Sequence, residues 1–215
     1  MAGGVTTHSG SDERLAQQVT PPPRQPFAFG VHVAVEATGS DLPAIAAFYA
    51  ESPEYLRGVE GREPGPADAA EFVHDAPPSG FAYTTAFNLL LRDTGGRIDG
   101  LMGVATDLPT AGVWHLGLLI VATRLHGSGF AQAALAAYEG WARAAGAQWL
   151  RLGVVAQNAR AIRFWQRQGY LELRRREGIA MGALSNTVIL MMKPLTARPL
   201  ADYLARVPRD RPDVA

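Results

Sequence analysis

Residues 124–135, RLHGSGFAQAAL, place two glycines around a serine immediately before an alanine-rich run. The nearly all-apolar stretch 113–121 precedes them and is typical of a central strand. Backbone N–H groups in the first turn of a helix have no partner inside the helix, and the helix dipole favours an anion there. Gly127 and Gly129 would let an anion approach the backbone closely. The stretch predicts either a turn that binds an anion such as a pyrophosphate, or a turn that needs glycine for its geometry alone.

Two common nucleotide-binding patterns do not fit this turn. A P-loop requires Gly-Lys-Ser/Thr, and residues 127–130 are Gly-Ser-Gly-Phe, without a lysine. A Rossmann turn requires G-x-G-x-x-G on a first strand, whereas Gln132 occupies the third glycine position here and the turn lies in mid-chain. If the turn binds a nucleotide, it does so in another way.

A second pattern follows further along the chain, Asn158-x-x-Ala161-Ile162-x-Phe164-Trp165-x-x-x-Gly169-Tyr170. Together with the glycine turn, it resembles the GNAT superfamily of acyl-CoA N-acyltransferases. The superfamily signature is Gln/Arg-x-x-Gly-x-Gly/Ala followed by a helix. The joint occurrence of the two motifs is far more specific than either motif alone.

The superfamily signature fits this sequence in two registers. Arg124-x-x-Gly127-x-Gly129 matches the letters, but it begins only three residues after Val121, the end of the apolar strand. The register that begins at His126 has the spacing of the family, and it continues through Gly129 to Ala131. We choose the second register, in which a histidine replaces the usual Gln or Arg.

The resemblance implies an α/β fold with three layers, a mixed central sheet of about seven strands with helices on both faces. The sheet would be splayed at the cofactor cleft. Acetyl-CoA would be the acyl donor, with its pantetheine arm along the strand ending at Val121 and its pyrophosphate on the glycine turn; no metal is implied. The residues assigned to the cofactor are Leu119, Ile120, Val121, His126, Gly127, Ser128, Gly129, Phe130, Ala131, Gln132, Asn158 and Trp165.

The groups that would transfer protons differ from those of the family. His115 occupies a position where one branch has a glutamate, and it is a possible base, or a structural histidine of an apolar strand. Gly153 replaces the glutamate of the protein Nα-acetylating branch. Trp165 replaces the usual tyrosine acid, which leaves Tyr170 as a weak acid candidate. Asn158 could contact the pantetheine arm, cap a helix, or do both.

The reaction implied is direct attack of an amine on the acetyl thioester in a ternary complex, because the chain has no cysteine for a covalent route. Residues 40–78, expected near the acceptor, carry eight acidic and two basic side chains, a balance of −6. That balance suits a small cationic amine, although an ordinary helix surface often looks the same. The alternatives are a protein N-terminus or lysine as the acceptor, and an acyl-CoA-binding sensor module without catalysis.

The element pattern places these residues on an α/β sheet. Residues 1–26 are expected to be a disordered, Pro-rich tail, residues 27–194 the acyltransferase domain, and residues 195–215 a tail with a short helix near 200–207. Residues 178–186 are expected to be a flexible loop. The expected strands are 27–37, 81–92, 97–106, 113–121, 148–155, 170–177 and 187–192, and the main helices begin near residues 40, 54, 66, 129 and 158.

Composition limits the remaining classes. Lys+Arg and Asp+Glu both number 20, so no basic excess suggests a nucleic acid. The short triplet 174–176, three arginines, is typical of a solvated strand or loop rather than a phosphate patch. No His or carboxylate cluster has metal-ligand spacing. Without a signal segment or an apolar run of membrane length, we expect a cytoplasmic monomer or homodimer that does not bind membranes.

Overall fold

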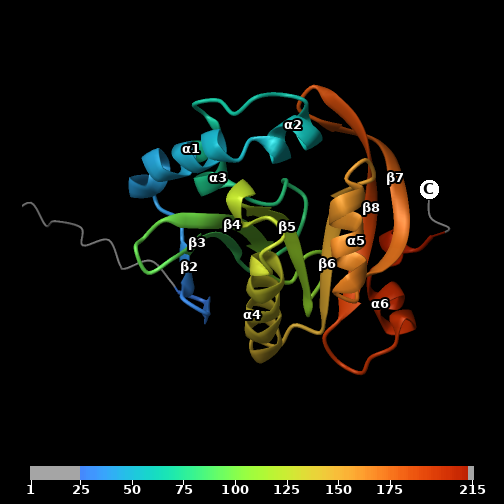
Figure 1. Ribbon diagram of the computed structural model, residues 1–215. Coiled ribbons are helices and arrows are strands. Elements are labelled where there is room, and N and C mark those ends of the chain that lie inside the picture. The colour runs from blue at the N-terminus through green and yellow to red at the C-terminus, as the bar shows by residue number, and fades with distance from the viewer. Residues whose placement is uncertain (1–24, 213–215) are drawn as a thin grey trace, which may run out of the picture.

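The computed structural model describes residues 25–212, which form a mixed eight-stranded sheet with helices on both faces (Figure 1). The expected α/β class is confirmed. The expected N-terminal tail lies outside the described residues except for its last two positions. The strands are β1 Phe27–Phe29, β2 His32–Glu36, β3 Ala86–Arg92, β4 Ile98–Ala105, β5 Val113–Val121, β6 Trp149–Val155, β7 Leu171–Met181 and β8 Leu184–Pro194. The α-helices are α1 Leu42–Glu51, α2 Glu54–Glu60, α3 Asp68–His74, α4 Phe130–Ala144, α5 Ala159–Arg167 and α6 Leu200–Arg206.

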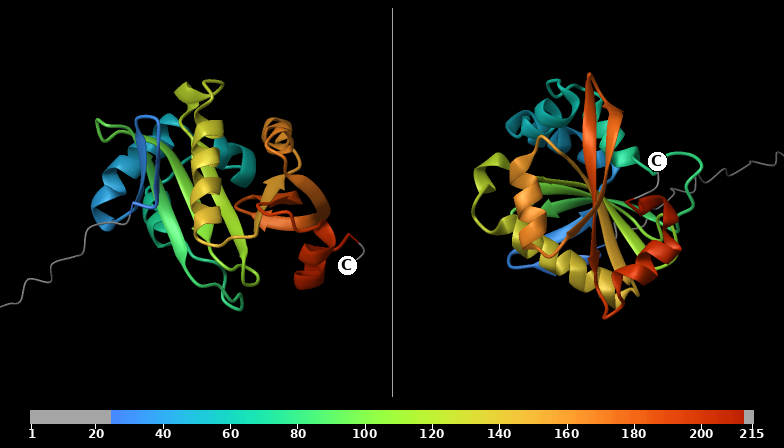
Figure 2. Two further views of the ribbon diagram at one scale, coloured as in Figure 1. Left: turned by 90° about the horizontal axis from the view of Figure 1, so that it is seen from below. Right: turned by 90° about the vertical axis from the view of Figure 1, so that its right-hand side faces the viewer.

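The sheet separates two helical layers. The strand order is β1-β2-β3-β4-β5-β6-β8-β7. In β3, Leu89 and Leu91 belong to the core beneath α4 and α5, whereas Leu90 between them belongs to the core beneath α1, α2 and α3. This alternation follows from the two-residue period of a strand buried on both faces. Figure 2 shows α4 and α5 on one side of the sheet and α6 on the other.

Strands β5 and β6 are parallel neighbours that pair over only part of their length. Their pairing runs from Val113 to Leu116 of β5, opposite residues 149–152 of β6, and stops there although both strands continue. At the same point the register of β5 with β4 shifts, so that Gly117 is the extra residue of a β-bulge. A bulge increases local twist, which turns the end of β5 away from β6. The splay implied by the resemblance is therefore present.

The N-terminal strand is split in two, which raises the strand count from about seven to eight. Gly30 has φ +53° and lies in a tight turn that pairs Phe29 with His32. The continuous alternation of residues 27–37 hides this turn, because one glycine within an apolar run also fits an uninterrupted strand.

The prediction of a flexible loop over residues 178–186 is wrong. Strand β7 runs to Met181 and β8 begins at Leu184, so a long antiparallel hairpin occupies this region. Its tip contacts α2: the Ala183 N–H donates to the Glu60 carbonyl at 2.8 Å, and Asn186 Nδ2 donates to the Val59 carbonyl at 2.8 Å. In Figure 1 the hairpin of β7 and β8 rises to the level of α2.

The C-terminal segment, expected as a tail with a short helix near 200–207, contains α6 and packs on the sheet. Helix α6 buries Tyr203 against Trp149 of β6, with ring centroids 6.0 Å apart. Asp210, fully buried, accepts hydrogen bonds from Arg151 Nε at 2.7 Å and from the Tyr203 hydroxyl at 2.6 Å. The described part of residues 195–215 thus belongs to the same core as the sheet.

Candidate active site

A cavity of about 570 Å³ opens where β5 and β6 part. It is lined on one side of the sheet by Asn158, Ala161 and Trp165, which belong to α5 and its cap. On the other side it is lined by Tyr55 and Val59 of α2. Because helices from both layers contribute, the cavity passes through the sheet at the splay. Two molecules could therefore meet here from opposite faces.

The β5 backbone forms one wall of this cavity. Leu119 lines the cavity, whereas Ile120 is buried in the core beneath α1 and α3. Residues 118–121 pair with β4 on one edge, and their other edge has no ladder partner in β6. That free edge can pair with an extended amide-containing chain, as in the strand additions by which proteins bind peptides.

The glycine turn ends in a group of unpaired backbone donors. Gly127 and Gly129 have φ of +83° and +89°, and a Cβ atom at either would meet nothing within 4 Å. Gly129 immediately precedes α4. Within residues 25–212, no acceptor is found for the N–H groups of Gly127, Gly129, Ala131 and Gln132. These N–H groups and the dipole of α4 make an open site for an anion.

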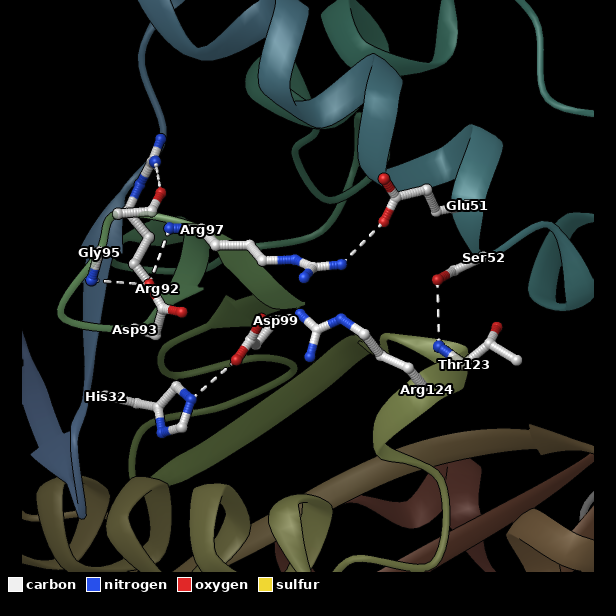
Figure 3. Close-up of polar contacts among 11 residues, drawn as sticks. His32, Glu51, Ser52, Arg92, Asp93, Gly95, Arg97, Asp99, Thr123 and Arg124 are labelled. Atoms are coloured by element: carbon white, nitrogen blue, oxygen red, sulfur yellow. Dashed lines mark hydrogen bonds and ion pairs between the residues drawn. The ribbon is translucent and has the colours of Figure 1, made fainter.

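The two possible motif registers differ in the side chain that would assist the anion. Arg124 forms an ion pair with the buried Asp99 of β4, and His32 Nε2 lies 2.9 Å from the same carboxylate (Figure 3). Arg124 is thus engaged in fixing the turn to the sheet. The position of Gly129 directly before α4 favours the register that begins at His126.

His126 joins the glycine turn to α5. Arg160 Nη1 lies 3.2 Å from His126 Nδ1, and a guanidinium can only donate, so Nδ1 is the acceptor. The proton of the neutral ring is then on Nε2, which donates to the Val121 carbonyl at 3.1 Å. The beginnings of α4 and α5 are therefore held side by side at the end of β5.

Other contacts fix the turn from the α1–α2 side. The Thr123 N–H donates to Ser52 Oγ at 3.1 Å, and the Thr123 hydroxyl donates to Glu54 at 2.6 Å (Figure 3 shows the first of these). Ser128 Oγ donates to the Leu125 carbonyl at 2.7 Å, so this hydroxyl is used inside the turn. Sequence reasoning missed the anchoring residues, because Asp99 and Ser52 carry no motif and act only through long-range contacts.

Asn158 caps a helix and also lines the cavity. Its Oδ1 accepts the Ala161 N–H at 3.0 Å, which caps α5. Its Nδ2 has no partner among residues 25–212, and the residue lines the cavity. Trp165 also lines the cavity and packs edge-on against Tyr170, with centroids 5.2 Å apart. Capping therefore leaves the amide donor of Asn158 available to a ligand.

His115 lines the cavity, but its environment does not suit a base. Arg151 Nη1 lies 3.2 Å from His115 Nδ1, which makes Nδ1 the acceptor and leaves the proton on Nε2. Burial, and then the charge of Arg151, lower the pKa of His115 to about 3. A ring with Nδ1 occupied and Nε2 protonated can donate a hydrogen bond, but it has no free lone pair for a proton.

Tyr170 is not among the residues that line the cavity. The side chain is 2% exposed, and within residues 25–212 its hydroxyl has no hydrogen-bond partner. Burial raises the pKa of Tyr170 well above its ordinary value. Because Tyr170 is buried and does not line the cavity, the geometry does not bring this acid candidate to the site.

The acidic balance of residues 40–78 does not describe the cavity. Five of these carboxylates are paired with four arginines, two of which lie outside the counted segment. Asp75 is the acidic residue of this segment that lines the cavity, and partial desolvation raises its pKa. The ion pairs are Asp41 with Arg92, Glu51 with Arg97, Glu60 and Asp68 with Arg62, and Glu63 with Arg57.

Membrane-spanning helices and metal-binding groups are two further features that the described part of the chain lacks. No helix there combines the length and the apolar character of a membrane span. No group of three His, Asp or Glu side chains in residues 25–212 could hold a metal ion.

Comparisons with known proteins identify the class of protein to which this fold belongs. The model of the acetyltransferase (GNAT) family matches residues 45–170. Because this match covers more than half of the sequence, the chain belongs to the GNAT acetyltransferase family. No curated protein matches the sequence significantly.

Solved structures resemble the chain at low sequence identity. An acetyltransferase from Thermus thermophilus shares 22% identity, with 78% of this chain and 99% of that chain covered and a TM-score of 0.61. A spermidine N-acetyltransferase from Vibrio cholerae, solved with CoA and spermine, shares 14%, with 77% and 96% covered and a TM-score of 0.59. The ribosomal-protein-S18-alanine N-acetyltransferase from Escherichia coli shares 18%, with 78% and 96% covered and a TM-score of 0.55. At these identities the likeness concerns the fold.

Proposed function

We propose that the protein transfers the acetyl group of acetyl-CoA to the primary amine of a small molecule, by direct attack in a ternary complex. The observation that carries the proposal is the cavity through the splayed sheet, with unpaired N–H groups at the start of α4 beside it. Acetyl-CoA would enter from the α4–α5 face. Its pyrophosphate would lie on residues 127–132, and its pantetheine arm along residues 119–121 and against Asn158 and Trp165.

The chemistry requires one bond to form and one to break. The neutral amine attacks the thioester carbonyl carbon, and a backbone N–H near Leu119 stabilises the resulting oxyanion. The C–S bond then breaks, the amide forms, and the ammonium proton leaves to solvent. A thiol with a pKa of about 8.5 leaves readily as the thiolate. The CoA thiolate then takes a proton from water. His115 donates a hydrogen bond from Nε2 into the cavity in this scheme.

A small acceptor is favoured by the hairpin of β7 and β8. Its tip is bonded to α2 through Ala183 and Asn186, and Val59 and Met181 line the cavity on either side of this junction. The junction bridges the acceptor side of the cavity, where a protein terminus or lysine would need open access. We assign to Asp75, on the same side, attraction of the acceptor's ammonium group before it loses its proton.

One observation favours a second function, an acyl-CoA-binding module without catalysis. Neither His115 nor Tyr170 provides a usable acid or base in the cavity. Such a module would bind acetyl-CoA and retain the thioester.

The test is thiol release from acetyl-CoA in the presence of a panel of primary amines. The chain has no cysteine, so the free thiol reports CoA without protein background. The proposal expects release that depends on the amine. It also expects Asp75→Asn to raise the KM of the amine about tenfold, with the Kd of acetyl-CoA unchanged. Binding of acetyl-CoA without release by any amine or protein N-terminal peptide would favour the binding module instead.

A further inference from the structure

We propose that the acceptor carries an anionic group, a carboxylate or a phosphate, in addition to its amine, and that Arg176 and Arg209 bind this group at the mouth of the cavity. The inference rests on the proposed transferase function and names the class of its acceptor. It concerns a part of the site that the family resemblance leaves unassigned, formed by β7 and the C-terminal segment.

The first observation is a second hollow of about 360 Å³ beside the cavity. Four residues line both spaces, so the two lie side by side: Arg176, Ile179, Leu190 and Arg209. Arg176 and Arg209 therefore border both the cavity and the hollow.

The second observation is an excess of positive charge around this hollow. Arg175 is engaged by Glu172, at 2.7 and 3.3 Å, and Asp210 is engaged by Arg151. Glu177 is the remaining carboxylate of the lining, against three remaining arginines. The charged residues that line the hollow are Arg174, Arg175, Arg176, Glu177, Arg209 and Asp210.

The remaining arginines are positioned but not neutralised. Arg174 Nη1 donates to the Arg209 carbonyl at 2.9 Å, while its buried Nε has no partner within residues 25–212. The Arg209 guanidinium lies 4.7 Å from the centroid of the Phe81 ring, which orients its plane. Arg176 forms no hydrogen bond or ion pair with the described part of the chain.

Electrostatics at Arg209 agree with an anion site. Partial burial lowers the pKa of Arg209, and repulsion by Arg151, Arg176 and Arg174 lowers it further, against the attraction of Asp210. A bound anion would relieve this repulsion. The planar guanidinium fork matches the two oxygens of a carboxylate or phosphate.

The placement of Asp75 completes the argument. Its carboxylate belongs to the wall formed by α3 and the following loop, whereas Arg176 and Arg209 come from β7 and the segment after α6. The lining thus offers one acidic group for an ammonium and two basic groups for an anion. This pattern is complementary to a molecule that carries both charges.

The experiment compares ω-amino carboxylates with n-alkylamines of matched length, and O-phosphoethanolamine with ethanolamine, as acceptors in the thiol-release assay. We expect the best anionic amine to exceed its neutral partner in kcat/KM by at least about tenfold. Arg176→Gln should remove this preference by raising the KM of the anionic amine, and Arg176→Lys should restore part of it. Arg97→Gln removes an exposed arginine paired with Glu51 and is the control for charge. It should change neither the preference for the anionic amine nor the KM of that amine.

The outcomes separate this inference from the proposed function. Equal use of neutral and anionic amines, or a preference that Arg176→Gln leaves intact, overturns the anion subsite while acetyl transfer stands. If no amine releases thiol, transfer fails, and calorimetric titration of the same amino carboxylates into the CoA complex decides the inference. Binding that Arg176→Gln weakens about tenfold supports the subsite, and absent or unchanged binding refutes it.

Discussion

At the scale of single residues, His115 illustrates how a neighbour changes the chemistry of a side chain. In sequence it is a histidine in an apolar strand, at a position suited to a base. Arg151, one strand away, occupies its Nδ1 and helps keep the ring neutral. The Arg151–Asp210 ion pair behind it satisfies the buried guanidinium, whose removal from water would otherwise be costly.

The lowered pKa of His115 makes stability depend on pH. The unfolded chain binds a proton at His115 below its ordinary pKa of about 6.5, whereas the folded protein resists protonation down to about 3. The contribution of neutral His115 to the free energy of unfolding is therefore fully present above about pH 6.5, and it falls as the pH drops towards 3. Between pH 6.5 and 5 we expect a loss of about 2 kcal/mol in the free energy of unfolding.

Denaturant unfolding at several pH values measures this contribution. His115→Gln keeps an acceptor for Arg151 but cannot titrate, so its stability should fall less steeply over this range than that of the wild type. His74→Gln, which replaces an exposed histidine of α3, should keep the wild-type slope. Parallel slopes for His115→Gln and the wild type would contradict the burial of a neutral ring.

At the scale of elements, the hairpin of β7 and β8 lies on the α2 side of the cavity, where we propose that the acceptor binds. Gly182 has φ +56° at its tip, and a Cβ atom there would lie 2.6 Å from both the Cβ and the carbonyl oxygen of Glu60. The junction with α2 therefore depends on a glycine for close approach as well as for its backbone conformation.

Replacing Gly182 with alanine should lift the hairpin tip from α2. We expect a higher KM for the amine, an unchanged Kd for acetyl-CoA, and a lower Tm. Gly178→Ala is the matched control, because Gly178 lies in the same hairpin with φ +70° but has nothing within 4 Å of its Cβ position. It should lose only the ~1–2 kcal/mol cost of a left-handed conformation and keep the wild-type KM. Equal effects of the two variants would show that the junction does not shape the acceptor site.

Elements with strong local signals were predictable from the sequence. Strand β5 coincides with the expected 113–121, and α4 and α5 begin within one residue of their expected starts. Their apolar periodicity and end signals are local. The hairpin over residues 178–186 was not predictable from local signals. Its first strand, β7, is rich in charged residues and contains a glycine, and it is ordered by pairing with β8 and by the contact of the hairpin tip with α2.

At the scale of the whole molecule, the site depends on contacts that no local pattern contains. Arg151 and Asp210 are 59 positions apart, and Arg124 and Asp99 are 25 apart. The glycine turn was recognisable because its motif lies within one short stretch of sequence directly before α4. The environment of His115 and the arginine-lined hollow were not recognisable from the sequence, because both require the C-terminal segment to fold back onto β6.

In the function that we propose, the two faces of the sheet bind different substrates. The α4–α5 face would hold the acyl donor, the opposite face would hold the acceptor, and the splay between β5 and β6 would join them. The central claim is that the start of α4 binds the pyrophosphate of acetyl-CoA.

Calorimetric titration of acetyl-CoA into Gly129→Glu tests this claim most directly. Gly146→Glu is the control, because Gly146 follows α4 at its other end, with φ +92° and equally open space. Both variants carry the same new charge and the same backbone cost, of about 1–2 kcal/mol. We expect Gly129→Glu to lose acetyl-CoA binding by at least about a hundredfold and Gly146→Glu to bind like the wild type. Equal affinity in both variants would contradict the assignment of the glycine turn to the pyrophosphate.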